Sequence, residues 1–390
     1  MSEALAQPEG PKIGMVLQEK YEIVGKLGEG GMGAVYEGMH VLIKRRVAIK
    51  CLHAQFATNP EIVARFRREA LAATSIGHQN IIEVTDMGQF PDGTLFIVLE
   101  FLKGRDWSDD IDNHGAQPLG KVVQIMLQVC DALDAAHALG IVHRDMKPEN
   151  IFLIERGGNE DFVKVLDFGI SKVKDTGPGS GMTQTGTTLG TPYYMSPEQA
   201  QGRKDVDNRA DIYSLGVILF QALTGQYPFD DESYPMLVLK ICTEPPPSLR
   251  TYRPDIPEAI ETLVNRMLSK DREGRHANCA EVKADLLPFA QVEDAPVVVP
   301  DAPSTAPMKS SMPEAAKASA VAAPDPRQQA AHTPYPSGPS QVPTTTNPPP
   351  PLLPRPFTLA RVAPALALPP GPLSTTPVTA ATTQTRHNTA

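Results

Sequence analysis

The spacing of apolar residues over the first hundred positions predicts a small sheet with one helix. Five short runs rich in β-branched and aromatic residues have the pattern of strands: residues 21–24, 34–36, 46–50, 81–84 and 95–99. A Pro-Asp-Gly turn at 91–93 separates the last two runs. Ile62, Phe66 and Leu71 recur near helical spacing, so a helix is expected over about 60–75. We therefore expect a mostly antiparallel sheet that carries one helix.

The pattern changes after Gly104, where helical periodicity dominates. One amphipathic helix has apolar residues at positions i, i+4, i+7 and i+11, namely Val122, Met126, Val129 and Leu133. The other expected elements are helices over about 209–224, ended by Gly225, and about 257–268, and short strands near 151–153 and 163–166. The sequence thus predicts an α+β fold with two lobes. The first, over about 21–102, is small and sheet-rich, and the second, over about 103–290, is larger and mostly helical.

Composition separates the last hundred residues from the rest. Of the 39 prolines, 22 follow Ala290, and the only aromatic residues in this stretch are Tyr335 and Phe357. Such a segment cannot bury enough apolar surface to offset the entropy of ordering it. We expect residues 1–20 to be an extension, 21–290 the folded domain and 291–390 a disordered tail. A P-x-x-P match at 351–354 allows polyproline II docking, although the composition favours a plain linker.

Charge and cysteine usage narrow the class of protein. The tail holds six basic and five acidic residues, a net charge of +1, so of the overall −9 the folded part carries −10, which argues against nucleic-acid binding. The four cysteines are scattered without a C-x-x-C pair, which suggests neither a zinc site nor a disulfide framework. No leader peptide and no apolar run long enough to span a membrane is found. A soluble, cytoplasmic protein is expected.

A glycine-rich turn, G-E-G-G-M-G at residues 28–33, stands between the first two expected strands. A dinucleotide-binding loop would need its third glycine to open a helix, whereas residues 34–36 continue as a strand. The alternatives are a plain turn and a hairpin whose backbone amides approach phosphates. Lys50 ends the third strand and would hold phosphates if a carboxylate positioned it. Glu69, on the expected helix, is the natural partner, although each residue alone has the pattern of a surface charge.

The most specific segment is H-R-D-M-K-P-E-N at 143–150, followed after 17 positions by D-F-G at 167–169. With G-x-G-x-x-G-x-V at 28–35 and V-A-I-K at 47–50, these motifs have the order and compatible spacing of the protein kinase family, which the chain resembles over about residues 21–290. The resemblance implies the bilobal protein kinase fold and phosphoryl transfer from ATP.

The resemblance also implies a role for each motif residue. Asp145 would accept or orient the proton of the substrate hydroxyl, and Lys147 would neutralise charge on the transferring phosphate. Asn150 and Asp167 would supply oxygen ligands to Mg²⁺ or Mn²⁺. The residues expected to bind ATP are Leu27, Gly28, Glu29, Gly30, Gly31, Met32, Gly33, Ala34, Val35, Ala48, Lys50, Glu69, Glu100 and Leu102.

The segment from Asp167 to Glu198 resembles the activation segment of these enzymes. Its middle is rich in glycine and threonine, and Thr183 and Thr185 are the candidate phosphorylation sites, because an added phosphate can dock on an arginine such as Arg144. A loop whose threonines have no such role is the alternative. Two structural roles are also implied: Glu198 would pair with Arg275, and Asp211 would brace the catalytic loop.

The threonine pair and the following G-T-P-Y-Y-M-S-P-E-Q resemble the eukaryotic-like serine/threonine kinases of bacteria. The resemblance implies a kinase that uses ATP and protein substrates, autophosphorylates its activation loop by self-association and acts in signalling. The acidic charge and the lack of a long apolar run favour action in the cytoplasm without nucleic acid or membrane. The main rival is a pseudokinase that uses the fold and the tail as a scaffold. Such proteins usually lack the counterparts of Lys50, Asp145 or Asp167, and all three are present. A small-molecule kinase is a second rival, against which the G-T-P segment at 190–192 argues.

Overall fold

The computed structural model describes residues 11–167 and 192–292, all of which belong to one compact unit, Met1–Ser310. Thr183, Thr185 and the expected disordered tail lie outside the described residues, as does most of the expected activation segment. Within the described ranges, no helix is both long enough and apolar enough to cross a membrane.

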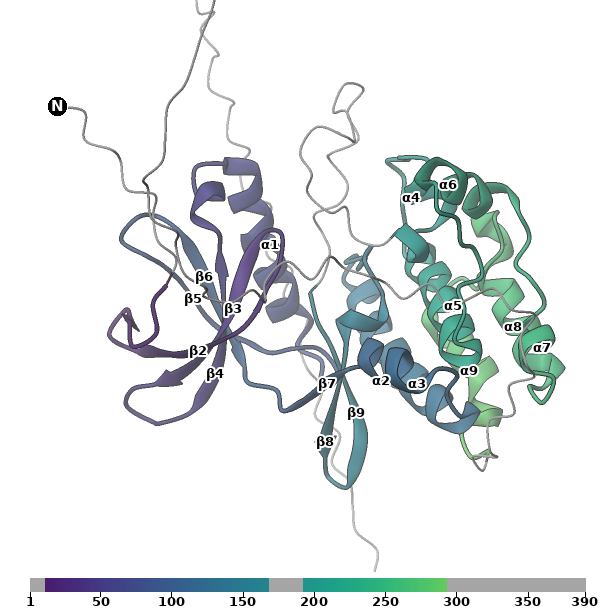
Figure 1. Cartoon of the computed structure of the whole chain (residues 1–390), viewed down its shortest axis with the longest axis horizontal. Helices are drawn as coiled ribbons and strands as arrows, with labels where there is room; N and C mark the ends of the chain where they lie inside the picture. Colours follow the sequence, from purple (N-terminus) through teal and green to yellow (C-terminus); the bar gives the residue numbers. More distant parts are fainter. Residues whose placement is uncertain (1–10, 168–191, 293–390) are drawn as a thin grey trace, which may run out of the picture. The chain divides into compact units, whose positions relative to one another are not determined.

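The first lobe is built on a six-stranded antiparallel sheet with the strand order β1-β2-β3-β4-β6-β5 (Figure 1). Its strands are β1 (Val16–Leu17), β2 (Tyr21–Glu29), β3 (Gly33–His40), β4 (Arg46–Leu52), β5 (Val84–Gln89) and β6 (Leu95–Glu100). The side chains on one face enclose a small core that includes Ile23, Ile49 and Phe96. Alternation of buried and exposed residues, as in β3, explains why period two predicted these strands.

The expected strand at residues 81–84 is wrong except at its last residue. Ile81 forms an isolated parallel bridge with Val165, and the amide of Ile82 donates to the carbonyl of the same Val165 at 3.0 Å. This short segment therefore pairs with the second lobe, and the strand of the first lobe starts only at Val84. Ile81 is buried and Ile82 half-buried at that contact between lobes, which local periodicity does not reveal.

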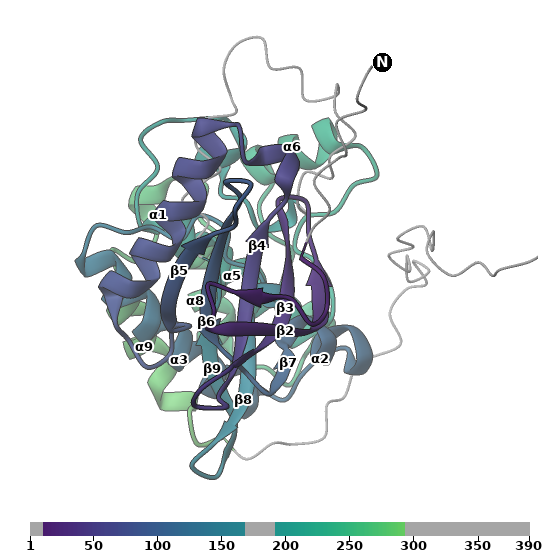
Figure 2. The ribbon, with the colours of Figure 1, turned by 90° about the vertical axis from the view of Figure 1, so that its left-hand side faces the viewer.

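The expected helix of the first lobe is confirmed as α1 (Pro60–Ile76). The side chain of Asn59 caps its start by accepting from the amides of Glu61 and Ile62, at 3.0 and 3.3 Å. Gly77 ends it in the left-handed conformation, with φ at 57°. The helix packs beside β5 (Figure 2). Phe66, on its buried side, is part of an apolar core cluster.

The second lobe is mostly helical, as expected. Its main helices are α2 (Trp107–His114), α3 (Leu119–Ala138), α5 (Arg209–Thr224), α6 (Tyr234–Thr243), α8 (Glu258–Met267) and α9 (Cys279–Leu286). Two single turns, α4 (Pro197–Ala200) and α7 (Leu249–Tyr252), are added to these. A three-stranded sheet of β7 (Gly104–Asp106), β8 (Ile151–Arg156) and β9 (Asn159–Val165) lies at the start of this lobe. Short 3₁₀ turns occur at Ala54–Phe56, Pro148–Asn150, Pro192–Tyr194, Arg272–Gly274 and Leu287–Phe289.

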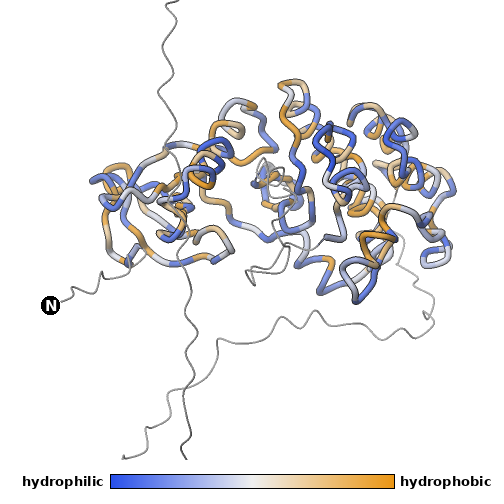
Figure 3. The backbone as a smooth tube through the Cα atoms, turned by 90° about the horizontal axis from the view of Figure 1, so that it is seen from above, coloured by the Kyte–Doolittle hydropathy of each residue, from blue (hydrophilic) through white to orange (hydrophobic). Residues whose placement is uncertain are grey.

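Two helices dominate the core of this lobe. Along α3 the four residues with helical spacing are all fully buried, and in the backbone tube apolar and polar segments alternate along the helices (Figure 3). The central helix, α5, is buried on every side from Ala210 to Thr224 and ends at Gly225, whose φ is 71°. The expected bounds of α5 and its terminating glycine are thus confirmed.

Candidate active site

The glycine-rich turn joins β2 and β3, with Gly28 opposite Val35 and Glu29 opposite Ala34. The amide of Gly30 donates to the carbonyl of Gly33 at 2.8 Å and closes the turn. The glycines differ in what they require. A Cβ at Gly33 would overlap the carbonyl oxygen of Cys51 on β4, whereas one at Gly28 would meet nothing within 4 Å. Gly33 is therefore required for the hairpin to pack closely against β4, whereas the space beside Gly28 is open.

His53 supports this turn from just beyond β4, and its sequence position gave no sign of it. The Nε2 atom of His53 donates to the carbonyl of Gly30 at 3.0 Å, and the amide of His53 donates to the carbonyl of Met32 at 3.0 Å. The imidazole also lies 3.8 Å from a carboxylate oxygen of Glu29. The tip of the hairpin is thus attached to the sheet at two carbonyls.

Lys50 meets two carboxylates at the centre of the site. Its Nζ lies 2.7 Å from Oδ1 of Asp167 and 3.6 Å from Oε2 of Glu69 on α1. The expected partner Glu69 is therefore in place, and the motif aspartate binds the same ammonium more closely.

These contacts shift both pKa values in the direction that keeps the groups charged. The surrounding protein atoms alone would lower the pKa of Lys50, but Asp167 and Glu69 outweigh that effect and raise it. The surrounding atoms would likewise raise the pKa of Asp167, but Lys50 outweighs them, with help from the charge of Lys147, and lowers it. Both shifts favour the charged forms of Lys50 and Asp167.

The loop that carries Asp145 is held by bonds to its own residues. The Nδ2 of Asn150, in the turn Pro148–Asn150, donates to the carbonyl of Asp145 at 2.7 Å. That bond does not use the Oδ1 of Asn150, which is an oxygen of the type that Mg²⁺ accepts as a ligand. The ring of His143 accepts from the amide of Asp145 at 3.3 Å and donates to the carbonyl of Leu166 at 3.0 Å. The residue before Asp167 is thus tied to the same loop.

Asp211 lies fully buried beneath this loop, in the first turn of α5. Its carboxylate accepts from the backbone amides of His143 and Arg144, at 2.8 and 2.7 Å, and from Nε2 of His137 at 2.8 Å. Arg144 has a φ of 65°, which is unfavourable for a residue with a side chain. The two hydrogen bonds from these backbone amides to Asp211 hold the backbone in that conformation directly before Asp145.

Glu198 and Arg275 form a buried, two-pronged ion pair, with N–O distances of 2.8 and 2.9 Å. Both side chains are at most 4% exposed. Arg275 also donates to the carbonyls of Ser269 and Arg209, so its guanidinium is fully used. Burial alone would raise the pKa of Glu198, but the bonds from Arg275 outweigh it and lower that pKa.

An ion pair that no sequence motif indicated joins the end of β6, in the first lobe, to β9, in the second. The Nζ of Lys164, a buried residue of β9, lies 2.6 Å from Oε1 of Glu100. The same oxygen accepts from the amide of Glu83 at 2.9 Å. Glu100, at the end of β6, stands opposite Val47, next to the pair of Ala48 and Leu99. A lysine inside the apolar run of β9 was the available signal.

The predicted site residues fall into four groups in the structure. Lys50, Glu69 and Asp167 meet directly, Asn150 bonds the Asp145 loop, and the glycine turn lies at the end of the same β3–β4 pair. Glu198 and Arg275 pair with each other inside the helical lobe, and Asp211 accepts from backbone amides of the loop directly before Asp145. The donor set, with one carboxylate, one amide oxygen and an ammonium, fits a nucleotide phosphate with a hard divalent cation.

Comparisons with known proteins agree with this geometry. The protein kinase domain family matches residues 21–286. The chain is 46% identical over 276 residues to serine/threonine-protein kinase Pkn1 of Myxococcus xanthus, covering 71% of this chain and 39% of that protein. It is 43% identical to pkn3 of the same organism, covering 70% and 50%, and 37% identical to PrkC of Bacillus subtilis, covering 70% and 41%. The chain thus spans half or less of the length of these relatives.

Among solved structures, the crystal structure of the PknI kinase domain of Mycobacterium tuberculosis is similar, with a TM-score of 0.56 and 29% identity. The match covers 72% of this chain and 100% of that domain.

Proposed function

Because this chain belongs to the protein kinase family, we propose that it transfers the γ-phosphate of ATP to serine and threonine hydroxyls of proteins. The observation that supports this most directly is the position of Lys50, which contacts Glu69 and Asp167 at once. A cation held by two carboxylates is positioned to bind nucleotide phosphates. The relatives named as serine/threonine kinases, and Lys147 two residues after Asp145, support the choice of hydroxyl.

In this proposal, Asp145 orients the substrate hydroxyl and takes up its proton, and Lys147 stabilises the transferring phosphate. Asn150 and Asp167 hold Mg²⁺ or Mn²⁺, which supplies neutralisation of the phosphate charge when it is bound. The bond from Asn150 to the carbonyl of Asp145 keeps the proposed metal ligand and the proposed base in one rigid turn.

The nucleotide would lie beneath the glycine hairpin, on the face of the sheet that carries Val35, Ala48 and Lys50. Gly28, Gly30 and Gly33 allow the hairpin to approach the phosphates, and the other expected residues enclose the base and the sugar. In this arrangement Val35 and Ala48 press on the adenine. The backbone of Glu100 and Leu102 meets its polar edge, and the bond of Glu100 to Lys164 fixes that backbone.

We further propose the domain limits 21–290, with the tail acting as a linker. Thr183 and Thr185 are proposed as autophosphorylation sites, reached by self-association of two copies. The proposed partners are ATP and protein substrates in the cytoplasm. The net negative charge of the folded part argues against nucleic acid as a partner.

The test is phosphate incorporation from labelled ATP and Mg²⁺ by the full chain, with a generic protein substrate and mapping of the modified residues. Wild type should label serine and threonine, and Lys50→Met and Asp145→Asn should not. Lys204→Met, which changes an exposed lysine of the second lobe, is the matched control and should behave as wild type. Nucleotide binding without any transfer would instead support the pseudokinase scaffold. Label on the tail alone would overturn the proposed loop sites.

A further inference from the structure

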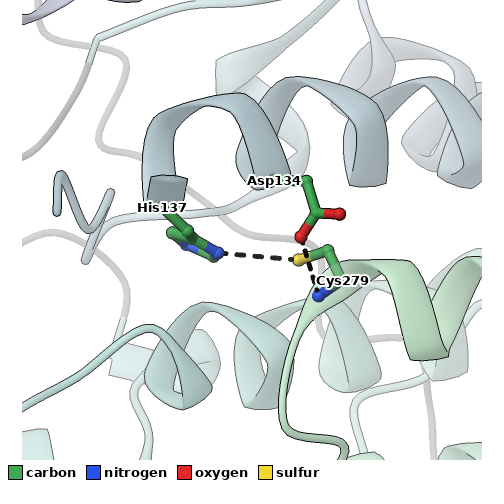
Figure 4. Close-up of side chains that lie close together, drawn as sticks. All are labelled: Asp134, His137 and Cys279. Carbon is green, nitrogen blue, oxygen red and sulfur yellow. Dashed lines mark hydrogen bonds between the residues drawn. The ribbon is translucent and has the colours of Figure 1, made fainter. Parts of the chain in front are cut away.

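A mixed cluster of potential metal ligands lies behind the catalytic loop, where α3 meets the start of α9. Asp134 and His137 come from α3 and Cys279 from α9 (Figure 4). One ligand atom from each lies within 4.8 Å of the others. The cysteine lies 142 positions from the histidine, so no local spacing in the sequence indicated the cluster.

The orientation of His137 is fixed from its far side. Its Nε2 donates to the buried carboxylate of Asp211 at 2.8 Å, which places the ring proton on that nitrogen. The lone pair of Nδ1 is therefore directed toward Sγ of Cys279, 3.9 Å away. A carboxylate that receives the other ring N–H is the usual support of a metal-binding histidine, because it fixes the tautomer and makes the ligand more basic.

The distances suit one ion of the zinc class. A tetrahedral Zn²⁺ bound at its ordinary distances would separate a sulfur and a nitrogen ligand by about 3.6 Å. The Sγ–Nδ1 distance of 3.9 Å is a few tenths of an ångström longer, which a small side-chain movement closes. The carboxylate of Asp134 accepts from the amide of Cys279 at 3.2 Å, so it is held beside the other two ligands. A second buried thiol, Cys130, is within hydrogen-bonding reach of Cys279.

An ion can reach the cluster from solvent. A cavity of about 680 Å³ opens beside it, with Asp134, His137, Asp207 and Asn278 among its lining residues. Cys279 itself is fully buried, behind Asp134 and His137. The Cys130 neighbour and burial raise the pKa of the Cys279 thiol, so a bound ion must displace the thiol proton to solvent.

We propose that Asp134, His137 and Cys279 bind a thiophilic divalent cation of the Zn²⁺ class, at a site separate from the nucleotide site. Mixed sulfur, nitrogen and oxygen ligands select such an ion, whereas the oxygen ligands of Asn150 and Asp167 suit Mg²⁺. Hydrogen bonds from Cys279 to Asp134 and His137 already hold the three residues together. Through Asp211, which also holds the amides of His143 and Arg144, the ligand His137 is linked to the catalytic loop.

The test uses the full-length, reduced and metal-free chain, with Co²⁺ as the optical probe and a large excess of Mg²⁺ to fill oxygen sites. Binding here should produce a sulfur-to-cobalt charge-transfer band that saturates at one equivalent and disappears when Zn²⁺ is added. Cys279→Ser should abolish the band. Cys242→Ser, which removes a thiol outside the cluster that donates to the carbonyl of Pro197, is the matched control and should keep the band.

A wild type without a charge-transfer band would overturn the proposal, as would a band unchanged in Cys279→Ser. If circular dichroism shows that this variant does not fold, Asp134→Asn decides the matter, since the amide still accepts from the amide of Cys279 but has no charge. We expect Co²⁺ to bind this variant at least about 10-fold more weakly. Unchanged affinity would show that Asp134 is not a ligand. The readout does not depend on kinase activity, so it stands apart from the proposed function.

Discussion

The ammonium of Lys50 lies 2.7 Å from the carboxylate of Asp167, although 117 positions of sequence separate the two residues. The contact joins β4, in the sheet of the first lobe, to the segment that directly follows β9 in the second lobe. The more distant carboxylate, that of Glu69, lies 3.6 Å from the same Nζ. The two acidic partners of Lys50 therefore hold it unequally, and substitutions should reveal that order.

Lys50→Met should lower kcat/KM for phosphate transfer by about 100-fold or more, because a positioned cation facing phosphate charge is lost. Glu69→Gln should cost less, since Asp167 still holds the lysine. Steady-state kinetics with ATP as the varied substrate checks both. An effect of Glu69→Gln as large as that of Lys50→Met would show that the helix, and not Asp167, positions the lysine.

Gly33→Ala and Gly28→Ala should separate stability from nucleotide binding. A Cβ at Gly33 overlaps the carbonyl of Cys51, so β3 and β4 must shift, at a cost of about 1–3 kcal/mol in the free energy of unfolding. At Gly28 the Cβ meets nothing, so stability should not change while nucleotide affinity falls. Urea unfolding and fluorescent nucleotide titration measure the two effects. Equal destabilisation by both variants would contradict the assignment.

His53→Ala should loosen the tip of the glycine hairpin, because the bond from Nε2 to the carbonyl of Gly30 is lost. One hydrogen bond of about 0.5–1.5 kcal/mol corresponds to a rise of about 2- to 10-fold in the KM for ATP, with kcat nearly unchanged. His53→Gln retains a donor and should recover part of the loss. A purely structural role would instead lower the melting temperature of both variants and leave the KM in place.

Glu198→Gln should lower the free energy of unfolding at pH 7 by about 3–5 kcal/mol, because Arg275 would be left buried without its partner. The pKa of Glu198 in the folded state lies below its ordinary value of 4.5. Its contribution is therefore complete above pH 4.5 and is lost as the pH falls through the folded-state pKa.

Urea unfolding from pH 7 down to pH 3 checks this. The wild type should lose stability steeply below pH 4.5, and Glu198→Gln should show a shallower slope. Glu273→Gln, which alters an exposed pair with Arg209, is the matched control and should follow the wild type. Parallel curves for Glu198→Gln and wild type would rule out the ion pair as the cause.

Local pattern was sufficient for the elements whose burial follows their own periodicity. The spacing of Val122 and Met126 predicted α3, and the length of an apolar run closed by Gly225 predicted α5. It failed at Ile81 and Ile82, because their apolar character serves a single bridge to the other lobe. The helix that begins at Trp107 was missed as well, since six of its eight residues are polar or charged.

The residues of the candidate site also divide into those that a sequence pattern predicts and those that only tertiary contacts reveal. Motif order predicted Lys50 and Asp167 together, and the structure places them in contact. His53 could not be found, since it acts on a carbonyl that only the folded chain brings near, that of Gly30. Lys164 stands out as a lysine in an apolar run, but its partner, the carboxylate of Glu100, is brought near only by folding. Residues that act through tertiary contact have no spacing rule in the sequence.

The central helix α5 has a kinetic consequence. From Ala210 to Thr224 every residue is buried, so none of these amides meets water unless the surrounding helices separate. Local opening cannot release them, and their hydrogens should exchange with deuterium only when the whole helical lobe unfolds. Mass spectrometry of the peptide that contains α5 would then measure the rate at which the whole helical lobe unfolds. That rate also sets how often the loop of Asp145 loses the hydrogen bonds that Asp211 provides.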